Sequence, residues 1–462
     1  MTQLFSHPGR SAMRPSGRAR PQFTPPLTSV EICAGAGGQA VGLHYAGFDH
    51  LALVEWDAHA VRTLSKNVGG WPEWNKARAE ALRPMDVKDF LASQTLAGLD
   101  LGEGDLDLLA GGVPCPPFSL AGKRLGKDDE RDLFPAALDI VKVLRPKAVM
   151  IENVRGILEP PEVFIDYRRD ILNNLHDLGY EVPAVEDHWL PEKQDLAMRA
   201  VWRRLDASDY GVPQLRPRAI LVAIRKDILE ESGAEFVWPS RLKGTQEVTV
   251  VDQLNPTMLR RCKQFWNKNY KGEPAAPGER TGKDIYHDWH HKASQAAAAG
   301  KRIAPTLVGG SRKHGGADLG PTRAKRAWAD LGVDAMGVAN DPADCDPERD
   351  LFRKTGPMLT VEQAAIIQGF PEKWRFQGGK TAQYRQVGNA FPPPVAEAVG
   401  RAIAAVLRPE MREDLLSDYE MDCEGNGSVQ GGPEQMILPV SSPPQARAAR
   451  KDRRGNYVGT RG

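Results

Sequence analysis

The stretch TSVEICAGAGG, residues 28–38, decides the fold of this chain. Its first half is a short apolar run with β-branched residues, which predicts a buried strand. Its second half is rich in glycine and leads into a helix that we expect to begin near Gln39. Glycines at such a turn let the backbone approach a ligand closely, and the helix start offers free N–H groups. A purely structural tight turn would contain the same glycines, so the segment alone identifies no ligand.

Outward from this turn, short apolar runs alternate with helical patterns. The apolar runs are HLALVEW (50–56), DLDLLAG (105–111), KAVMIENV (147–154) and RAILVAIR (218–225), and the helical patterns include DAHAVRTLSKNV (57–68) and FPAALDIVKVL (134–144). This alternation is typical of an α/β fold with a parallel sheet. We therefore expect a first domain over residues 28–225.

The second half of the chain has a different pattern. Residues 226–357 are rich in Trp, Lys and Gly and show no clear period, so we expect a second, smaller and irregular domain there. Helical spacing returns in TVEQAAIIQGF (360–370) and PPPVAEAVGRAIAAVL (392–407), which predicts a return to the first domain over 358–412. Both ends, 1–27 and 413–462, are polar and are expected to be disordered tails.

Composition restricts the class of protein. The 462 residues include 61 Lys and Arg against 60 Asp and Glu, so any nucleic-acid surface must be local. The five cysteines are scattered without a CxxC pair, which predicts neither a disulfide framework nor a metal site. Because no apolar run approaches the roughly 20 residues that span a bilayer, we expect a cytoplasmic protein without a membrane segment.

Acidic residues follow two further apolar segments. Glu55 lies near the end of the run HLALVEW, where a carboxylate can accept hydrogen bonds from ribose hydroxyls. Asp86 is expected at the end of a third strand, where its carboxylate can bind an adenine amino group. Either residue could instead cap a helix or lie on the surface. Their order at successive strand ends favours an adenosine-containing cofactor.

A cysteine lies in an unusual loop, Gly111–Ser119, with the sequence GGVPCPPFS. Most lone cysteines are small buried apolar residues. Here prolines on both sides of Cys115 break any regular element, directly after a predicted strand and at the sheet edge where ligands bind. A thiolate placed there is a strong nucleophile at neutral pH, so Cys115 is the candidate nucleophile.

These segments resemble the DNA (cytosine-5) methyltransferase family. The glycine turn is similar to the family's cofactor motif, and Pro114-Cys115 to its catalytic dipeptide. Three further matches are Glu152-Asn153-Val154, Gln214-Leu215-Arg216-Pro217-Arg218 and Gln386-Val387-Gly388-Asn389-Ala390. The five motifs run in the family's order over about 30–225 and 359–407. The resemblance implies a Rossmann-like, S-adenosylmethionine-dependent methyltransferase sheet with a second, smaller target recognition domain, of the bacterial restriction-modification type.

The resemblance also implies catalytic roles. Cys115 would attack ring carbon 6 of a flipped cytosine, and Glu152 would neutralise the charge that develops at ring nitrogen 3. Arg218 would contact the base, and Arg216 would orient the glutamate. Without the family, two arginines beside a strand could equally face solvent, and Glu152 could form an ordinary salt bridge.

Two sets of binding residues follow from the resemblance. The cofactor is S-adenosylmethionine, and the matching positions are Cys33, Gly35, Gly37, Gly38, Glu55, Trp56, Asp86, Val87, Gly112, Pro114, Leu133, Asn389 and Ala390. Cys33 stands where the family usually has an aromatic residue. The predicted DNA contacts are Ser119, Lys123, Arg124, Arg131 and Thr306. Residues that read bases are not identified, and Arg302, Arg312, Lys313 and Arg323 are candidates by residue type only.

The implied partner is double-stranded DNA, and we expect either a member of a restriction-modification system, with a cognate restriction endonuclease acting separately, or an orphan DNA methylase. We also expect a bacterial, nucleoid-associated monomer. Two alternatives stay open. An RNA cytosine-5 methyltransferase would have a short recognition domain, whereas the variable region here spans about 130 residues. A catalytically silent DNA-binding relative would not need Cys115, Glu152 and Arg218 together.

Overall fold

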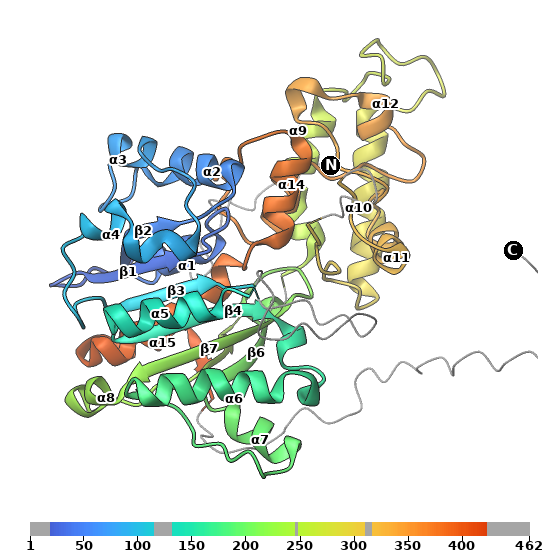
Figure 1. The fold of residues 1–462 in the computed structure, drawn as a ribbon. Coiled ribbons are helices and arrows are strands. Elements are labelled where there is room, and N and C mark those ends of the chain that lie inside the picture. The colour runs from blue at the N-terminus through green and yellow to red at the C-terminus, as the bar shows by residue number, and fades with distance from the viewer. Residues whose placement is uncertain (1–18, 115–131, 245–247, 310–316, 423–462) are drawn as a thin grey trace, which may run out of the picture. The chain divides into compact units, whose positions relative to one another are not determined.

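A seven-stranded sheet lies at the centre of the computed structural model, which describes residues 19–114, 132–244, 248–309 and 317–422 (Figure 1). The strand order is β2-β1-β3-β4-β7-β5, and β6 also pairs with β7. Strands β1 (Leu27–Ile32), β2 (Phe48–Val54), β3 (Leu108–Gly112) and β4 (Ala148–Val154) are parallel. The predicted α/β class is therefore confirmed.

One strand runs against the expected direction. The run RAILVAIR forms β7 (Pro217–Arg225), which pairs antiparallel with β4, so the sheet is mixed. Strands β5 (Tyr180–Glu181) and β6 (Trp202–Asp206) also pair antiparallel with β7. Because β7 is buried on both faces, its apolar run gives no alternation from which direction could be inferred.

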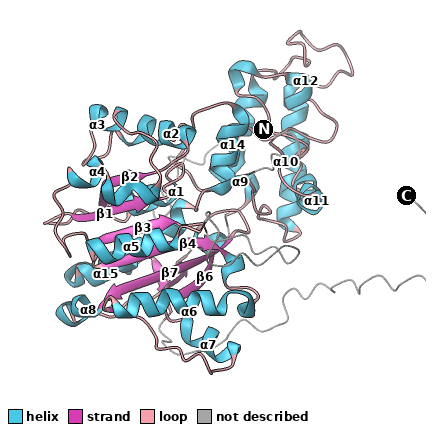
Figure 2. Cartoon of the chain, in the orientation of Figure 1, coloured by secondary structure: helices cyan, strands magenta, loops and turns pink. Residues whose placement is uncertain are grey.

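Helices cover both faces of the sheet (Figure 2). One face packs on α1 (Gly38–Tyr45), α8 (Lys226–Ser232) and α15 (Pro393–Leu407), with Leu108 and Val399 in the shared core. The other packs on α5 (Phe134–Leu144) and α6 (Pro161–Asp177), with Leu109 and Ile140 between them. Buried strand residues therefore alternate between two apolar clusters, as period-two geometry requires.

Shorter elements connect these layers. They are α2 (Ala58–Val68), α3 (Lys76–Glu80), the 3-10 helix η1 (Val87–Ala92), α4 (Gln94–Ala97), η3 (Arg155–Ile157), α7 (Pro191–Met198) and η4 (Ala207–Tyr210). A two-stranded sheet joins β8 (Pro239–Leu242) to β9 (Tyr419–Met421). In these ranges no helix is both long enough and apolar enough to cross a membrane.

The region 226–357, expected to be irregular, contains several helices. They are α9 (Val250–Lys263), α10 (Gly282–Ala298), α11 (Thr322–Asp330), η6 (Pro342–Asp344) and α12 (Pro347–Asp350). Side-chain caps stabilise their starts: Thr249 accepts from the Asp252 amide, and Thr281 and Asp284 form a reciprocal capping box. Pro256 within α9 interrupts the helical pattern of its sequence. The capping residues were therefore the sequence signal that could have identified these helices.

The chain then returns to the sheet through further helices. They are α13 (Val361–Ile367), α14 (Lys380–Asn389), α15, η7 (Pro409–Met411) and α16 (Arg412–Leu416). A single apolar cluster joins α9, α10 and α13 to the region of α2, with Met258, Trp289 and Leu64 among its members. The return segment therefore packs against both the sheet and the helical region. The expectation of disordered tails over 1–27 and 413–462 is wrong for their described parts: Phe23, Leu415 and Leu416 of α16, and Tyr419 of β9 are buried in the apolar cluster on one face of the sheet.

Candidate active site

The glycine turn is held tightly between β1 and α1. Gly35 and Gly37 have φ angles of 55° and 88°, which a residue with a side chain rarely adopts. A Cβ on Gly37 would lie 2.8 Å from the ring of Trp374, and one on Gly38 would lie 2.2 Å from the carbonyl oxygen of Phe391. A Cβ on Gly35 would meet no atom within 4 Å. The turn therefore packs against Trp374 and Phe391 from the C-terminal part of the chain on one side, and there is open space beside Gly35.

Glu55 stands at this open edge, just beyond β2. Its two carboxylate oxygens accept hydrogen bonds from the backbone amides of Gly35 and Asp57, each at 2.7 Å. Burial raises the pKa of Glu55, and these amides oppose the rise. Each carboxylate oxygen has a second lone pair, so both can still accept a hydroxyl group. The neighbouring Trp56 is 77% exposed.

Asp86 does not end a strand, contrary to expectation. It precedes η1 and accepts a hydrogen bond from the Lys88 amide at 3.0 Å, so it is a helix cap in this structure. The amide of Met85 donates to the carbonyl of Glu55, which brings the loop beside the end of β2. A loop, not a strand, therefore brings Asp86 close to the end of β2, and apolar periodicity cannot predict the path of a loop.

Cys33 lies among these acidic groups. Burial, followed by the charges of Glu55 and Asp86, raises the pKa of the Cys33 thiol to about 12. Burial likewise raises the pKa of Cys262 to about 12 and that of Cys345 above its ordinary value. All three cysteines of the described chain are therefore protonated thiols at neutral pH, and none has the character of a nucleophile.

A cavity of about 470 Å³ opens at the carboxyl ends of β3 and β4. It brings together residues from four sequence motifs, and they are Gly112, Val113, Pro114, Glu152, Asn153, Val154, Arg216, Arg218, Thr306, Leu307, Val308, Gly309, Gly388 and Asn389. The side-chain Nδ2 of Asn153 donates to the carbonyl of Val113 at 2.7 Å and so fixes the path of the chain toward Pro114. Sequence reasoning had given Asn153 no role of its own.

Glu152 and Arg218 form the charged centre of this cavity. Nε of Arg218 lies 2.7 Å from Oε1 of Glu152. Because β4 and β7 pair antiparallel with Val154 opposite Arg218, the two side chains come from adjacent strands. Burial raises the pKa of Glu152, and the positive charges of Arg218 and Arg216 only partly offset this effect. The result is a carboxyl group that retains its proton more readily than an exposed glutamate.

Arg216 has a different environment from the one expected. It is fully buried and donates hydrogen bonds to the carbonyls of Leu307, Gly388 and Ala390 at 2.7–2.8 Å. Two of these carbonyls are at the end of α14, where helix geometry leaves carbonyls without a backbone donor. The arginine that forms an ion pair with Glu152 is Arg218, so the predicted orienting contact from Arg216 is not present among the described residues.

Two buried glutamine side chains add further hydrogen bonds between the segments that Arg216 joins. Nε2 of Gln214 donates to Oε1 of Gln368, and its own Oε1 accepts from the amide of Leu307. Nε2 of Gln368 donates to the carbonyl of Ala390. These side chains join the start of β7, the segment 304–309 and the end of α14, which the motif matches alone did not show.

Close backbone packing fixes Asn389 in the cavity wall. A Cβ on Gly309 would lie 2.2 Å from Oδ1 of Asn389, and one on Gly388 would lie 2.6 Å from the amide nitrogen of Gly309. Thr306 donates its hydroxyl to the carbonyl of Leu215 and also lines the cavity. Glycine at both positions is needed for the two segments to approach this closely.

Several predicted site residues lie away from the cavity, and others lie outside the residues that the structure describes. Val87 is buried in the apolar cluster beneath η1, and Leu133 packs against the same cluster at the start of α5. The predicted residues that lie outside the described ranges are Cys115, Ser119, Lys123, Arg124 and Arg131. The residue before Cys115, Pro114, is in the cavity wall.

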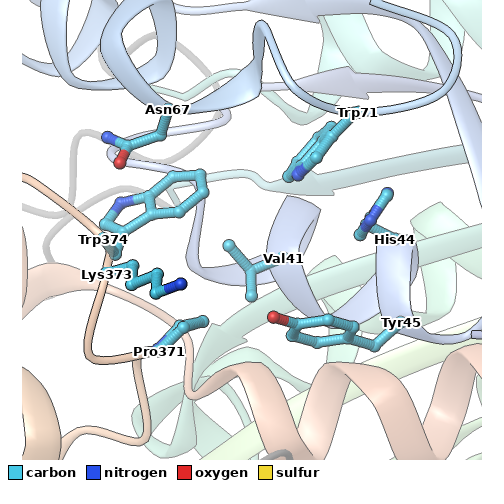
Figure 3. Close-up of a pocket in the computed structure, with 8 residues that line it drawn as sticks. All are labelled: Val41, His44, Tyr45, Asn67, Trp71, Pro371, Lys373 and Trp374. Atoms are coloured by element: carbon cyan, nitrogen blue, oxygen red, sulfur yellow. The ribbon is translucent and has the colours of Figure 1, made fainter. Parts of the chain in front are cut away.

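A second cavity, of about 140 Å³, lies between α1, the end of α2 and residues 371–374 (Figure 3). The rings of His44 and Trp71 stack there with centroids 4.4 Å apart. Trp374 also lines it and donates from Nε1 to the carbonyl of Ala36 at 3.1 Å. This cavity contains none of the predicted site residues, but Trp374 supports the turn directly and was missed because no motif includes it.

Comparison with known proteins agrees with this geometry. The model of the family C-5 cytosine-specific DNA methylase matches residues 27–405. Type II methyltransferase M.NaeI of Lentzea aerocolonigenes is 45% identical over 83% of this chain and 76% of its own length. M.NgoMIV of Neisseria gonorrhoeae is 41% identical over 83% and 99%, and M.Eco47II of Escherichia coli is 32% identical over 82% and 79%.

The chain therefore belongs to the C-5 cytosine-specific DNA methylase family, and the resemblance read from its motifs is confirmed. It is a DNA (cytosine-5) methyltransferase of the Type II restriction-modification kind. Methyltransferases of this family use S-adenosylmethionine, and their substrate is DNA.

Proposed function

We propose that this chain transfers a methyl group from S-adenosylmethionine to carbon 5 of a cytosine within a specific double-stranded DNA sequence, through a covalent adduct with Cys115. The observation that carries the proposal is the position of Glu152. Its buried carboxyl group, with a raised pKa, faces a cavity whose wall includes Pro114. A proton donor and the residue that leads to the proposed nucleophile therefore share one cavity.

Cys115 supplies the attacking thiolate. It adds to carbon 6 of cytosine, and the ring electrons shift so that nitrogen 3 gains negative charge. Glu152 donates its proton to nitrogen 3, while Arg218 holds the carboxyl group and contacts the base. Carbon 5 is then nucleophilic enough to accept a methyl group. Loss of the carbon-5 proton to water, departure of the thiolate and return of the nitrogen-3 proton to the Glu152 carboxylate restore the aromatic ring and the catalytic groups.

Arg216 acts as a positioning residue in this proposal. Its guanidinium joins segment 304–309 to the end of α14, and both are in the cavity wall. It therefore keeps Thr306 and Asn389 at fixed positions relative to Glu152, without contacting the carboxylate itself.

The open edge of the glycine turn fits an adenosine-containing cofactor. There is free space beside Gly35, and the Glu55 carboxylate stands at the same edge with lone pairs for ribose hydroxyls. We assign this edge to S-adenosylmethionine, with Trp56 and Asp86 beside the adenine and Asn389 and Ala390 at the far end. When bound, the cofactor supplies a methyl group on a positively charged sulfur. The remaining contacts proposed are Cys33, Gly37, Gly38, Val87, Gly112, Pro114 and Leu133.

The target cytosine must leave the duplex. Its carbon 5 and carbon 6 are shielded in stacked DNA, and flipping costs a few kcal/mol, which contacts elsewhere on the DNA must offset. We assign phosphate contacts to Thr306 at the cavity wall and to Ser119, Lys123, Arg124 and Arg131 of the segment after Cys115.

The proposed organisation follows from these assignments. Residues 28–225 and 358–412, together with α8, α16 and β9, form the catalytic part, and the rest of 226–357 recognises the target. The enzyme acts as a cytoplasmic monomer at the nucleoid, and a cognate restriction endonuclease acts separately on the same sequence.

Bisulfite sequencing of DNA from cells that express the chain tests the proposal. We expect one short sequence in which a single cytosine is protected from conversion, and no protection with Cys115→Ser. Arg241→Ala, at a half-exposed position on β8, is the control and should protect the same sequence. Complete conversion of all cytosines with the wild-type chain would contradict the proposed activity.

A further inference from the structure

Helix α11 begins close to the catalytic cavity. A Cβ on Gly320, two residues before the helix, would lie 3.7 Å from Val308, and Val308 is in the cavity wall. Three residues further along the chain, Arg323 is at most about 11 Å from Gly320 between Cα atoms. Stacked base pairs are about 3.4 Å apart, so the helix start lies within a few base pairs of a cytosine in the cavity.

One face of α11 anchors the helix. Trp328 is fully buried in the apolar cluster shared with α10, and α11 lies beside that helix (Figure 1). Before the helix, Asp318 accepts from the amide of Gly320 and from Nζ of Lys325 at 2.8–3.0 Å. The start of the helix is therefore fixed from both sides.

The opposite face carries free positive charge. Arg323 and Arg326 are exposed and three residues apart, so they lie on the same face. Neither side chain has a hydrogen bond or an ion pair within the described residues, whereas Lys325 pairs with Asp318, and Lys301 pairs with Asp330 at the end of α11. Two unpaired guanidinium groups on a rigid helix beside the cavity are suited to bind a polyanion.

We propose that α11 is the recognition helix of this enzyme, and that Arg323 contacts a guanine base edge while Arg326 contacts a phosphate. Arginine matches the two acceptors of guanine with two parallel donors, and residues at the start of a recognition helix are the ones that reach base edges. Arg326, about one helical turn further along α11, contacts the phosphate backbone of the DNA in this proposal. This inference rests on the proposed function and adds which element reads the sequence.

The experiment compares variants by bisulfite sequencing and by methylation kinetics on duplexes. With Arg323→Ala we expect kcat/KM on the wild-type sequence to fall at least tenfold, and duplexes with one guanine replaced to be methylated as well as the original. Arg323→Lys should lose the same discrimination, because a lysine lacks the paired donors. Arg326→Ala should weaken binding of all duplexes similarly and lower the slope of log K against log salt by about one.

Lys283→Ala is the matched control, because it removes one exposed positive charge at the far end of α10, about 22 Å along the helix from its last turn. It should keep the wild-type sequence preference. If the wild-type enzyme protects a sequence and both Arg323 variants keep its preference within twofold, α11 is not the recognition helix although the proposed function stands. If the wild-type chain protects no cytosine, the proposed function itself fails.

Discussion

Nε of Arg218 lies 2.7 Å from Oε1 of Glu152, and both side chains are about 90% buried. A buried ion pair of this kind costs desolvation of two charges, and the pKa of Glu152 is raised despite its positive partner. The pair therefore holds a carboxyl group in place while leaving it able to carry a proton. This is the property that protonation of a pyrimidine ring nitrogen requires.

Replacement of Glu152 by glutamine removes that proton without changing the shape of the side chain. We expect kcat to fall about 10²- to 10⁴-fold, the range of general acid catalysis. Since a raised pKa keeps the acid protonated to higher pH, wild-type kcat should decline only as pH rises through that pKa. The glutamine variant should lack this decline. Glu181→Gln, exposed on β5, is the control in pH-rate profiles and should follow the wild type.

The loss of stability on replacing Arg216 should depend on pH differently from the loss on replacing Arg218. Arg216→Met leaves three buried carbonyls without a donor, and we expect the free energy of unfolding to fall by about 3 kcal/mol or more. Carbonyls do not titrate, so most of this loss should be independent of pH. The smaller part that comes from losing the Arg216 charge near Glu152 should grow from pH 5 to pH 8, but less than with Arg218→Met.

Arg218→Met instead leaves the buried Glu152 carboxyl without its cation, which raises its folded-state pKa further. A carboxyl with a raised folded-state pKa favours the folded state most below its unfolded pKa, and this contribution is lost as pH rises. The variant should therefore become less stable from pH 5 to pH 8 relative to wild type. Urea denaturation at both pH values measures this, and equal pH dependence of the two variants would contradict the assigned environments.

Trp374 should influence cofactor affinity without touching DNA. Trp374→Phe removes the hydrogen bond to the carbonyl of Ala36 but keeps a ring near Gly37. We expect the Kd for S-adenosylmethionine, measured by calorimetry, to rise about two- to tenfold, the equivalent of one hydrogen bond. Trp266→Phe, on the loop after α9, should leave the Kd unchanged. An unchanged Kd in Trp374→Phe would show that the turn does not depend on this contact.

Much of the catalytic sheet could be predicted because its signals are local. The glycine turn, the strand that precedes Glu55 and the helix Phe134–Leu144 follow from periodicity and glycine placement. The helices α9 and α10 were missed although the buried positions of α9, such as Val251, Leu254 and Met258, follow helical spacing, because Pro256 interrupts that pattern. Their caps at Thr249 and Thr281 were the remaining signal. Capping residues occur often outside helix starts, so they give a weaker signal than a repeated apolar pattern.

The parts of the site that could not be predicted depend on contacts between distant segments. Motif order implied that Glu152 and the two arginines meet, but not which arginine bonds to the carboxylate. That choice depends on the carbonyls of Leu307 and Ala390, which lie 91 and 174 residues from Arg216 along the chain. The position of Asp86 beside Glu55 also arises from a loop path that no local pattern specifies.

Covalent trapping tests the central claim most directly. A duplex that carries 5-fluorocytosine in the methylated position cannot lose a proton from carbon 5, so an adduct should persist after methyl transfer. In the presence of S-adenosylmethionine we expect one adduct per wild-type molecule, located at Cys115 by peptide mass spectrometry. Cys345→Ser, which removes a partly buried thiol outside the cavity, should be trapped equally well, and Cys115→Ser should not be trapped. A folded, cofactor-bound wild-type enzyme that methylates normal DNA but forms no adduct at Cys115 would contradict the account.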